Sequence, residues 1–404
     1  MKTKKLFEYL WGGVVALCAQ LVSFLLRGHY KRKNIWIISE KKTEARDNGY
    51  YLFKYLREKR PELNAYYVIK AGSADEKKVA AYGNTIRYDS FRHCVYYYSA
   101  KIRACSQVHG VRPFEELSRL SSIRVFRRRD QHQIYLTHGI AKDYREAYDF
   151  RRMGYELMIC GATPEYDYYK STFRYPDKNI ALTGICRYDG LSDEGRREKI
   201  ILVMPTFRDW LRTADSSVDV APPADMARFR ESEFFAFYRD LLSDRALNDW
   251  AAENGYRIVF YLHYTFQPYC AAFEEVFRGK PNIVVANRKE YDVQKLLIAS
   301  AFLITDYSSV CFDFAYMRKP VVYAQFDKKE YREKHYQEGW FVYERDGVGP
   351  ILEDVPSVAE YTVARGKEGF AMDPLYQQRT DALFPYHDTD NSGRVYDAIL
   401  RLDE

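Results

Sequence analysis

The chain has 404 residues, 47% of them hydrophobic and 29% charged, which is enough for two cores of ordinary domain size. Its 62 basic residues stand against 56 acidic ones, a formal net charge of +6, and this balance argues against a dedicated nucleic-acid binder. The seven cysteines are scattered and form no C-x-x-C pair. That pattern argues against a disulfide framework or a zinc site and favours a reducing, cytoplasmic compartment.

The N-terminus carries an uncharged segment, Tyr9 to Leu26, between the basic flanks MKTKK and RGHYKRK. Its length is borderline for the roughly 20 residues that a membrane-spanning helix needs. On a helix, one face of the segment is apolar: Leu10, Val14, Leu17, Leu21 and Leu25. We therefore expect residues 1–33 to form a helix with a basic flank that associates with the inner membrane leaflet, as a peripheral or monotopic anchor. A signal peptide and a buried helix are the alternatives.

Beyond this leader, strand-like apolar runs alternate with helical patterns, beginning with NIWIIS at Asn34–Ser39. Such alternation is typical of parallel sheets covered by helices on both faces. The polar run SDEGRREK, Ser192–Lys199, interrupts the series, which then restarts at IILVMP. The sequence thus predicts an α/β protein with two doubly wound, Rossmann-like domains, at residues 34–195 and 196–404.

Ligands of doubly wound domains bind outside the carboxyl ends of the strands. Polar groups follow several predicted strands there: THG at Thr137–Gly139, PTFRD at Pro205–Asp209, LHY at Leu262–Tyr264 and TDYSS at Thr305–Ser309. One histidine after a strand is more often structural, but His138 and His263 occupy equivalent places in the two halves. The chain has no G-x-G-x-x-G and no Walker loop, so dinucleotide redox chemistry and ATPase chemistry lose their usual support.

The stretch from Leu296 to Tyr323 predicts a strand at Ala301–Ile304, a turn, a helix at Val310–Met317 and a second strand at Val321–Tyr323. Free N–H groups at the helix start, with hydroxyls of Thr305, Ser308 and Ser309, suit an anion such as a phosphate. The alternative is that these residues only cap the helix.

These residues resemble a known family. The run ITDYSSVCFDFAYMRKPVVYAQFDKKEYREKHYQEGWFVY is similar to the C-terminal signature of the CDP-glycerol glycerophosphotransferase family, the teichoic-acid and capsule enzymes. ISEKKTEARDNGYYLFKYLREKRPELNAYYVI, YLTHGI, MPTFRD and YLH support the resemblance, which covers roughly Asn34 to Tyr343.

The resemblance implies a GT-B-like fold, in which two domains face a central cleft. It also implies an enzyme at the cytoplasmic face of the membrane that moves glycerol phosphate or ribitol phosphate from CDP-glycerol or CDP-ribitol onto a hydroxyl and releases CMP. The acceptor would be a polyol-phosphate, cell-wall or capsular polymer, or a lipid-linked form of one. The alternatives are a GT-B glycosyltransferase using a nucleotide sugar and a non-catalytic assembly subunit of the same fold.

Such a transfer needs a base for the acceptor hydroxyl and cationic or N–H donors that stabilise the CMP leaving group. His138 is the expected base. By resemblance, His263 and the Ser308/Ser309 helix start hold the diphosphate. The remaining candidates on the donor side are weaker: Thr206, Arg208 and Thr305 near the diphosphate, Asp306 orienting the turn, and Asp313 toward a ribose hydroxyl or as a helix-surface or capping acid. No cluster of carboxylates has the spacing of metal ligands, so we expect no tightly bound metal. A loosely held Mg²⁺ is the alternative.

Overall fold

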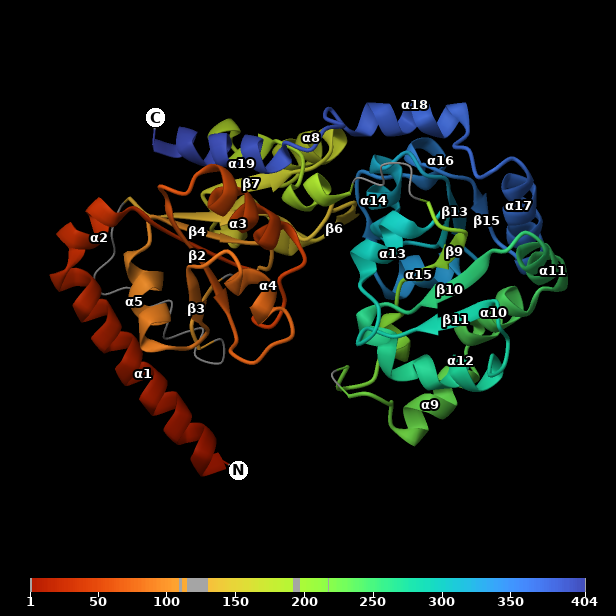
Figure 1. The fold of residues 1–404 in the computed structure, drawn as a ribbon, viewed down its shortest axis with the longest axis horizontal. Coiled ribbons are helices and arrows are strands. Elements are labelled where there is room, and N and C mark those ends of the chain that lie inside the picture. Colours follow the sequence, from red (N-terminus) through yellow and green to blue (C-terminus); the bar gives the residue numbers. More distant parts are fainter. Residues whose placement is uncertain (1, 109–110, 115–129, 192–196, 217, 404) are drawn as a thin grey trace. The chain divides into compact units, whose positions relative to one another are not determined.

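The computed structural model describes residues 2–108, 111–114, 130–191, 197–216 and 218–403 (Figure 1). The chain forms two compact units. The first contains Met1–Ile140, Glu146–Gly190 and Pro385–Glu404, and the second contains Ala141–Arg145 and Leu191–Phe384. Each unit is built around its own parallel sheet, as the alternation of strands and helices predicts.

The first unit has a seven-stranded sheet in the order β3-β2-β1-β4-β5-β7-β8, and every pair of neighbours is parallel. All five residues of the central strand β1 are buried, because helices cover both faces. The strands are β1 (Ile35–Ser39), β2 (Asn64–Ile69), β3 (Thr85–Arg87), β4 (Ile102–Cys105), β5 (His132–Tyr135), β7 (Leu157–Cys160) and β8 (Ile180–Leu182). The helices are α1 (Lys2–Leu25), α2 (Arg27–Lys33), α3 (Asn48–Lys59), α4 (Glu76–Ala80), α5 (Phe91–Ser99), α7 (Phe150–Met153), α8 (Thr163–Ser171) and α19 (Asn391–Leu400), with short 3-10 turns η2 (Glu146–Tyr148), η3 (Asp177–Asn179), η4 (Cys186–Gly190) and η7 (Arg401–Asp403).

Helix α1 packs along α5 with its small and polar face (Figure 1). Ala19 is fully buried in this contact, and the Ser99 hydroxyl donates a hydrogen bond of 2.8 Å to the Ser23 hydroxyl. The opposite face is exposed and apolar: Trp11, Val14, Leu17, Leu21 and Leu25. Among the described helices none alone is long and apolar enough to cross a membrane, and the segments Trp11–Leu25 and Arg27–Lys33 meet that test only as a pair bent by 79°.

The second unit has a six-stranded parallel sheet in the order β11-β10-β9-β12-β13-β15, with a separate antiparallel pair of β14 and β6. Its strands are β6 (Asp143–Tyr144), β9 (Ile200–Val203), β10 (Arg257–Tyr261), β11 (Ile283–Ala286), β12 (Phe302–Thr305), β13 (Val321–Ala324), β14 (Gln337–Glu338) and β15 (Ile351–Leu352). The helices are α9 (Pro223–Arg230), α10 (Glu233–Ser243), α11 (Arg245–Glu253), α12 (Cys270–Val276), α13 (Val293–Ala299), α14 (Val310–Tyr316), α15 (Lys328–Lys334), α16 (Tyr343–Asp346), α17 (Val355–Lys367) and α18 (Pro374–Leu383), with 3-10 turns η5 (Asp209–Leu211) and η6 (Tyr264–Tyr269).

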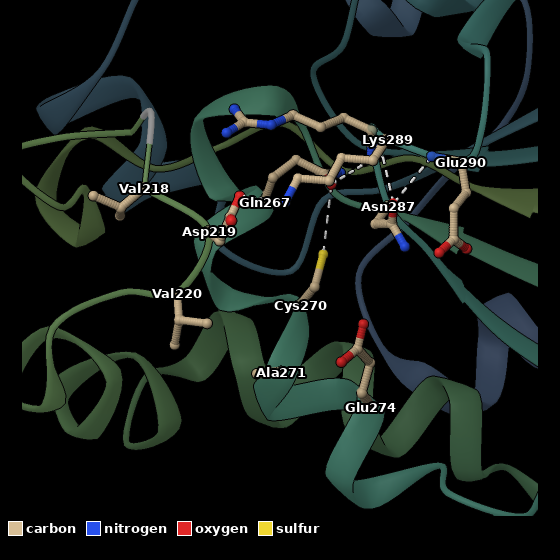
Figure 2. A pocket seen from close by; sticks show the side chains of 11 residues that line it. Val218, Asp219, Val220, Gln267, Cys270, Ala271, Glu274, Asn287, Lys289 and Glu290 are labelled. Carbon is tan, nitrogen blue, oxygen red and sulfur yellow. Dashed lines mark hydrogen bonds and ion pairs between the residues drawn. The ribbon is translucent and has the colours of Figure 1, made fainter.

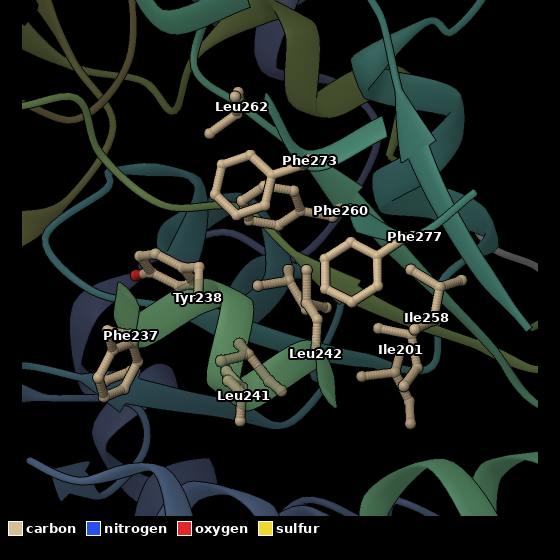
Figure 3. Close-up of a cluster of buried hydrophobic side chains, with 14 of the residues drawn as sticks. Ile201, Phe237, Tyr238, Leu241, Leu242, Ile258, Phe260, Leu262, Phe273 and Phe277 are labelled. Atoms are coloured by element: carbon tan, nitrogen blue, oxygen red, sulfur yellow. The ribbon is translucent and has the colours of Figure 1, made fainter. Parts of the chain in front are cut away.

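The core of the second unit is rich in aromatic side chains from α10, α12 and the sheet. Phe260 of β10 packs against Phe273 of α12, with ring centroids 4.6 Å apart, and against Tyr238 of α10, with ring centroids 5.6 Å apart (Figure 3). Burying rings of this size contributes a large share of the apolar stabilisation of the unit. The core thus holds the carboxyl ends of β9, β10 and β12 in place.

The C-terminal segment differs from the predicted domain division. We assigned all of residues 196–404 to the second domain, but Pro385–Glu404 belongs to the first unit. The reason is a helix cap: the Asp189 carboxylate accepts hydrogen bonds from the backbone N–H groups of Asn391, at 2.7 Å, and Ser392, at 2.9 Å. The predicted boundary between residues 195 and 196 lies outside the described residues.

Candidate functional site

His138 lies just beyond the carboxyl end of β5, and its side chain is 61% exposed. The residue before it, Thr137, has a φ of 55°, an uncommon backbone conformation for a β-branched residue. Two hydrogen bonds hold this conformation: Thr137 Oγ1 donates to the carbonyl of Gly139 at 2.6 Å, and Asn48 Nδ2 donates to the carbonyl of Thr137 at 3.0 Å. The backbone that presents His138 is therefore firmly held.

The His138 ring contacts an aspartate that the sequence reasoning did not select. Asp47 Oδ2 lies 2.6 Å from His138 Nδ1, and Gln107 Nε2 lies 3.1 Å from the same ring nitrogen. Arg187 Nη1 donates to Asp47 Oδ1 at 3.0 Å and to the His138 carbonyl at 2.6 Å. Burial alone would raise the pKa of Asp47, but the charges and hydrogen bonds of His138 and Arg187 outweigh it and lower the pKa to about 2.

His263 follows β10 in the second unit and begins η6. Its Nδ1 accepts a hydrogen bond of 3.3 Å from the backbone N–H of Thr265. The ring stacks on Phe207, with centroids 4.7 Å apart and planes at 27°, and Tyr264 lies on it at 4.6 Å. The half-buried imidazole is thus fixed by one backbone donor and two aromatic neighbours.

Ser308 and Ser309 lie between β12 and α14, and both are half-buried. The Ser308 hydroxyl accepts from the N–H of Val310 at 3.4 Å, while Ser309, at the N-cap position, makes no side-chain capping hydrogen bond. Parallel pairing of β9 with β10 and of β9 with β12 brings His263 and this serine pair to the same edge of the sheet. The edge therefore offers an imidazole and two hydroxyls to a ligand.

Three predicted donor-side residues lie beneath this edge. The Arg208 guanidinium is fully buried, and it pairs with Asp306 at 2.9 Å and with Asp327 at 2.6 Å. Burial opposes its charge, but the two carboxylates outweigh this effect and raise the pKa of Arg208. Thr305 is also fully buried and donates to the carbonyl of Met204 at 2.7 Å. These side chains therefore stabilise the strand ends and are too deeply buried to contact a ligand directly.

Thr206 and Asp313, the two remaining predicted residues, are also buried. Thr206 is 7% exposed; its N–H donates to Asp306 Oδ1 at 2.8 Å, and its hydroxyl has no hydrogen-bond partner among the described residues. Asp313 lies in α14 and is 2% exposed. Asp313 is therefore not the helix-surface acid that we considered as its alternative.

A third histidine lies beside this edge and was missed. His335 Nδ1 lies 2.7 Å from Asp209 Oδ2, and its ring meets the edge of Phe207, with centroids 4.8 Å apart. Desolvation lowers the pKa of His335, although Asp209 opposes that effect. No local pattern in the sequence points to it, because 126 positions in the chain separate Asp209 from His335.

A pocket of about 190 Å³ opens beyond β11 in the second unit (Figure 2). Its cations are engaged: Lys289 pairs with Asp219 at 2.8 Å, and Arg288 Nη1 donates to the carbonyl of Ser216 at 3.2 Å. The pocket also contains the carboxylates of Glu274 and Glu290. The carboxylates and the engaged cations make this pocket unfavourable for a diphosphate. In the described part of the chain, no three His, Cys, Asp or Glu side chains are grouped so that they could hold a metal ion.

Comparison with known proteins agrees with the geometry. The family model described as CDP-Glycerol:Poly(glycerophosphate) glycerophosphotransferase matches residues 20–401. The minor teichoic acid biosynthesis protein GgaB of Bacillus subtilis is 33% identical over 394 residues, which is 96% of this chain and 42% of that protein. The teichoic acid poly(glycerol phosphate) polymerase of the same organism is 23% identical over 57% of this chain and 30% of its own length. The chain thus spans less than half the length of these two relatives.

Solved structures show the same fold. The wall teichoic acid polymerase TagF superposes with a TM-score of 0.62 at 17% identity, covering 97% of this chain and 98% of that chain. A UDP-N-acetylglucosamine 2-epimerase from Listeria monocytogenes superposes with a TM-score of 0.56 at 12% identity, covering 92% and 97%. Because the family model covers nearly the whole chain, the protein belongs to the CDP-glycerol:poly(glycerophosphate) glycerophosphotransferase family.

Proposed function

We propose that this protein transfers glycerol phosphate, or ribitol phosphate, from a CDP-linked donor to a hydroxyl of a teichoic-acid or related polymer and releases CMP. The match of the family model over residues 20–401 is the observation that carries this proposal. The names of the relatives support it, since they include poly(glycerol phosphate) and poly(ribitol-phosphate) polymerases and primases. In this proposal the first unit acts on the acceptor and the second unit binds the donor.

The reaction assigns a proton-transfer role to His138. The acceptor hydroxyl oxygen attacks the phosphorus that carries the polyol, and a new P–O bond forms as the bridging P–O bond to CMP breaks. His138 takes the hydroxyl proton, and CMP leaves with the electron pair of the broken bond. The exposed imidazole at the end of β5 suits this role, because a general base must approach within hydrogen-bond distance of the proton that it removes.

The diphosphate of the CDP-linked donor, and the CMP that leaves from it, are assigned to the second unit. His263 and the hydroxyls of Ser308 and Ser309 would donate hydrogen bonds to the diphosphate oxygens. Thr206, whose buried hydroxyl has no hydrogen-bond partner among the described residues, is a further donor in this proposal. Arg208, Asp306 and Thr305 would support the site from beneath, and Asp313 would act on the ribose only after a rearrangement that exposes its carboxylate.

The proposal includes no tightly bound metal and leaves room for a loosely held Mg²⁺ on the donor diphosphate. Such an ion would partly neutralise the charge of the diphosphate. Turnover measured over a range of EDTA and Mg²⁺ concentrations tests this point. Activity that survives complete chelation would remove Mg²⁺ from the proposal.

Membrane association is the second part of the proposal, with a lipid-linked acceptor at the inner leaflet. The exposed apolar face of α1, followed by the basic helix α2, has the composition of a helix that lies in a membrane interface. Leu21→Asp should reduce binding to anionic phospholipid vesicles in a sedimentation assay. Leu375→Asp is the matched control, because both leucines are 49% exposed. Equal vesicle binding by the two variants would contradict the anchor.

A donor panel tests the transferase function. The purified protein is incubated with CDP-glycerol, CDP-ribitol or UDP-sugars and a polyol-phosphate acceptor, and the products are analysed by mass spectrometry. We expect CMP release and growth of the acceptor by one or more polyol phosphates. Turnover of a UDP-sugar without turnover of either CDP-polyol would replace this proposal by a glycosyltransferase. No turnover of any donor would favour an assembly subunit of the same fold.

A further inference from the structure

We infer that Asp47 is a positioning residue for His138, and that Glu40 frees Asp47 for this task by capping helix α3 in its place. This inference rests on the proposed function, because it assigns His138 the role of a base. It adds two carboxylates to the site that neither the family match nor the sequence reasoning identifies.

Asp47 occupies the N-cap position of α3, where an aspartate side chain normally accepts a hydrogen bond from the first turn of the helix. Its side chain makes no such bond. Both carboxylate oxygens instead turn away from the helix: Oδ2 lies 2.6 Å from His138 Nδ1, and Oδ1 accepts from Arg187 at 3.0 Å. The helix start therefore needs another acceptor.

Glu40, directly after β1, supplies that acceptor. The oxygens of its carboxyl group accept three backbone hydrogen bonds at the start of α3, from the N–H groups of Arg46 at 2.9 Å, Asp47 at 2.8 Å and Tyr50 at 2.7 Å. Glu40 is only 4% exposed, so these bonds offset the cost of burying its polar atoms. An unusual cap from outside the helix thus leaves the Asp47 carboxylate available to the imidazole.

The contact determines which ring nitrogen of His138 carries the proton. An ionised carboxylate only accepts hydrogen bonds, so Nδ1 donates to Asp47, and Nε2 keeps the lone pair that a base requires. Gln107 Nε2 lies 3.1 Å from the same Nδ1 and could donate only to an unprotonated nitrogen, but the charged carboxylate at 2.6 Å is the stronger partner and favours the proton on Nδ1. When His138 takes a proton, the new charge lies beside Asp47. The charged or titratable groups near this pair include Arg187 and Glu40, and also Tyr67, Cys105 and Cys186.

Asp47→Asn tests the inference, because it keeps the shape of the side chain and removes the carboxylate. We expect kcat to fall by about 10²-fold with the donor KM unchanged, and the acid limb of the pH profile to move to lower pH. Asp149→Asn is the matched control. Asp149 is also an N-cap aspartate paired with an arginine, Arg174 at 2.5 Å, but no histidine contacts it among the residues that the structure describes. We expect this control to keep the wild-type kcat and pH profile.

Two further measurements separate positioning from a loss of structure. In the His138→Ala background, Asp47→Asn should cost almost nothing more, because its effect passes through the imidazole. Nitrogen-15 NMR of the His138 ring, assigned from the His138→Ala spectrum, should show the neutral ring protonated at Nδ1 in the wild type and predominantly at Nε2 in Asp47→Asn.

Several results would overturn the inference. They are unchanged kcat in Asp47→Asn, an equal loss in the His138→Ala background, or a wild-type ring protonated at Nε2. The NMR result does not depend on turnover. A wild-type protein that consumes no CDP-polyol while its ring is protonated at Nδ1 would therefore reject the proposed function and leave the Asp47 contact established.

Discussion

His138 and His263 each follow a parallel strand at the carboxyl edge of a sheet, but their rings use Nδ1 in opposite ways. His138 Nδ1 faces the Asp47 carboxylate and therefore donates, which leaves Nε2 as an acceptor. His263 Nδ1 accepts from the backbone N–H of Thr265, so Nε2 carries a proton that it can donate. Two histidines in equivalent places are thus prepared for different tasks: one to take a proton, the other to hold an anion.

The charges and side chains around the two rings also fit these two different tasks. Beside His138 the structure places a carboxylate, which stabilises the ring once it has gained a proton. Beside His263 it places Phe207, Tyr264 and the edge that carries Ser308 and Ser309. A base gains from a neighbouring negative charge, whereas an anion site would be weakened by it. The following experiments test this contrast, beginning with the largest expected effect.

The largest effect is expected for His138→Ala in a single-turnover assay with CDP-glycerol. Removing a positioned base should slow the chemical step by about 10²–10⁴-fold. His132→Ala is the control, because His132 also contacts an aspartate in the same unit, Asp403 at 3.4 Å, yet lies at the start of β5. If His138→Ala turns over at nearly the wild-type rate, another group removes the proton.

A somewhat smaller effect is expected for the double variant Ser308→Ala/Ser309→Ala. Each hydrogen bond to a charged oxygen contributes about 1.5 kcal/mol or more, so the affinity for CDP-glycerol should fall about 10²-fold in calorimetry. Ser232→Ala, which removes a helix-capping hydroxyl from α10, should leave the affinity unchanged. An unaltered affinity in the double variant would remove the serines from the diphosphate site.

His263→Gln tests whether one hydrogen bond from the His263 side chain accounts for its effect on donor binding. Glutamine can place an amide N–H near the position of Nε2, whereas His263→Ala removes the donor. We expect His263→Ala to lower donor affinity by about tenfold and His263→Gln to restore part of it. Equal losses in the two variants would mean that ring stacking on Phe207, and not the N–H group, is the function of His263.

The last experiment measures stability and not activity, and it concerns the buried acid Glu40, which accepts a hydrogen bond from the backbone of Asp47. Burial, and then the charge of Asp47, raise the pKa of Glu40 to about 8, from 4.5 in the absence of these effects. Between these two pH values the folded protein holds a proton that the unfolded chain releases. Its free energy of unfolding should therefore fall as pH rises, by up to about 1.4 kcal/mol per pH unit.

Urea unfolding of the wild type and Glu40→Gln at several pH values between 4.5 and 8 measures this slope. The glutamine variant cannot release a proton at this position, so we expect its slope to be smaller. Equal slopes in the two proteins would show that Glu40 ionises in the folded state as it does in the unfolded chain.

Local sequence patterns were sufficient for much of the fold and part of the site. The strand at β12, the helix at α14 and the strand at β13 lie within one or two residues of their predicted bounds, because apolar runs and capping residues mark them. The positions of His138, His263, Ser308 and Ser309 at strand ends follow from the same patterns.

Partners distant in sequence could not be predicted in this way. The local sequence predicts that Arg208 binds phosphate. In the structure Arg208 instead pairs in the core with Asp327, 119 positions away. The local sequence predicts an ordinary helix cap at Asp47, because no pattern around it indicates that Glu40 caps the helix instead. The return of α19 to the first unit likewise depends on Asp189, about 200 residues before it.

The most direct test of the division of labour is the affinity for CDP-glycerol of His138→Ala and His263→Ala, measured side by side by calorimetry. Circular dichroism first confirms that both variants are folded. The account predicts that His138→Ala binds the donor as the wild type does and that His263→Ala binds it more weakly. Loss of donor binding in His138→Ala with normal binding in His263→Ala would contradict the account, because it would place the donor on the first unit.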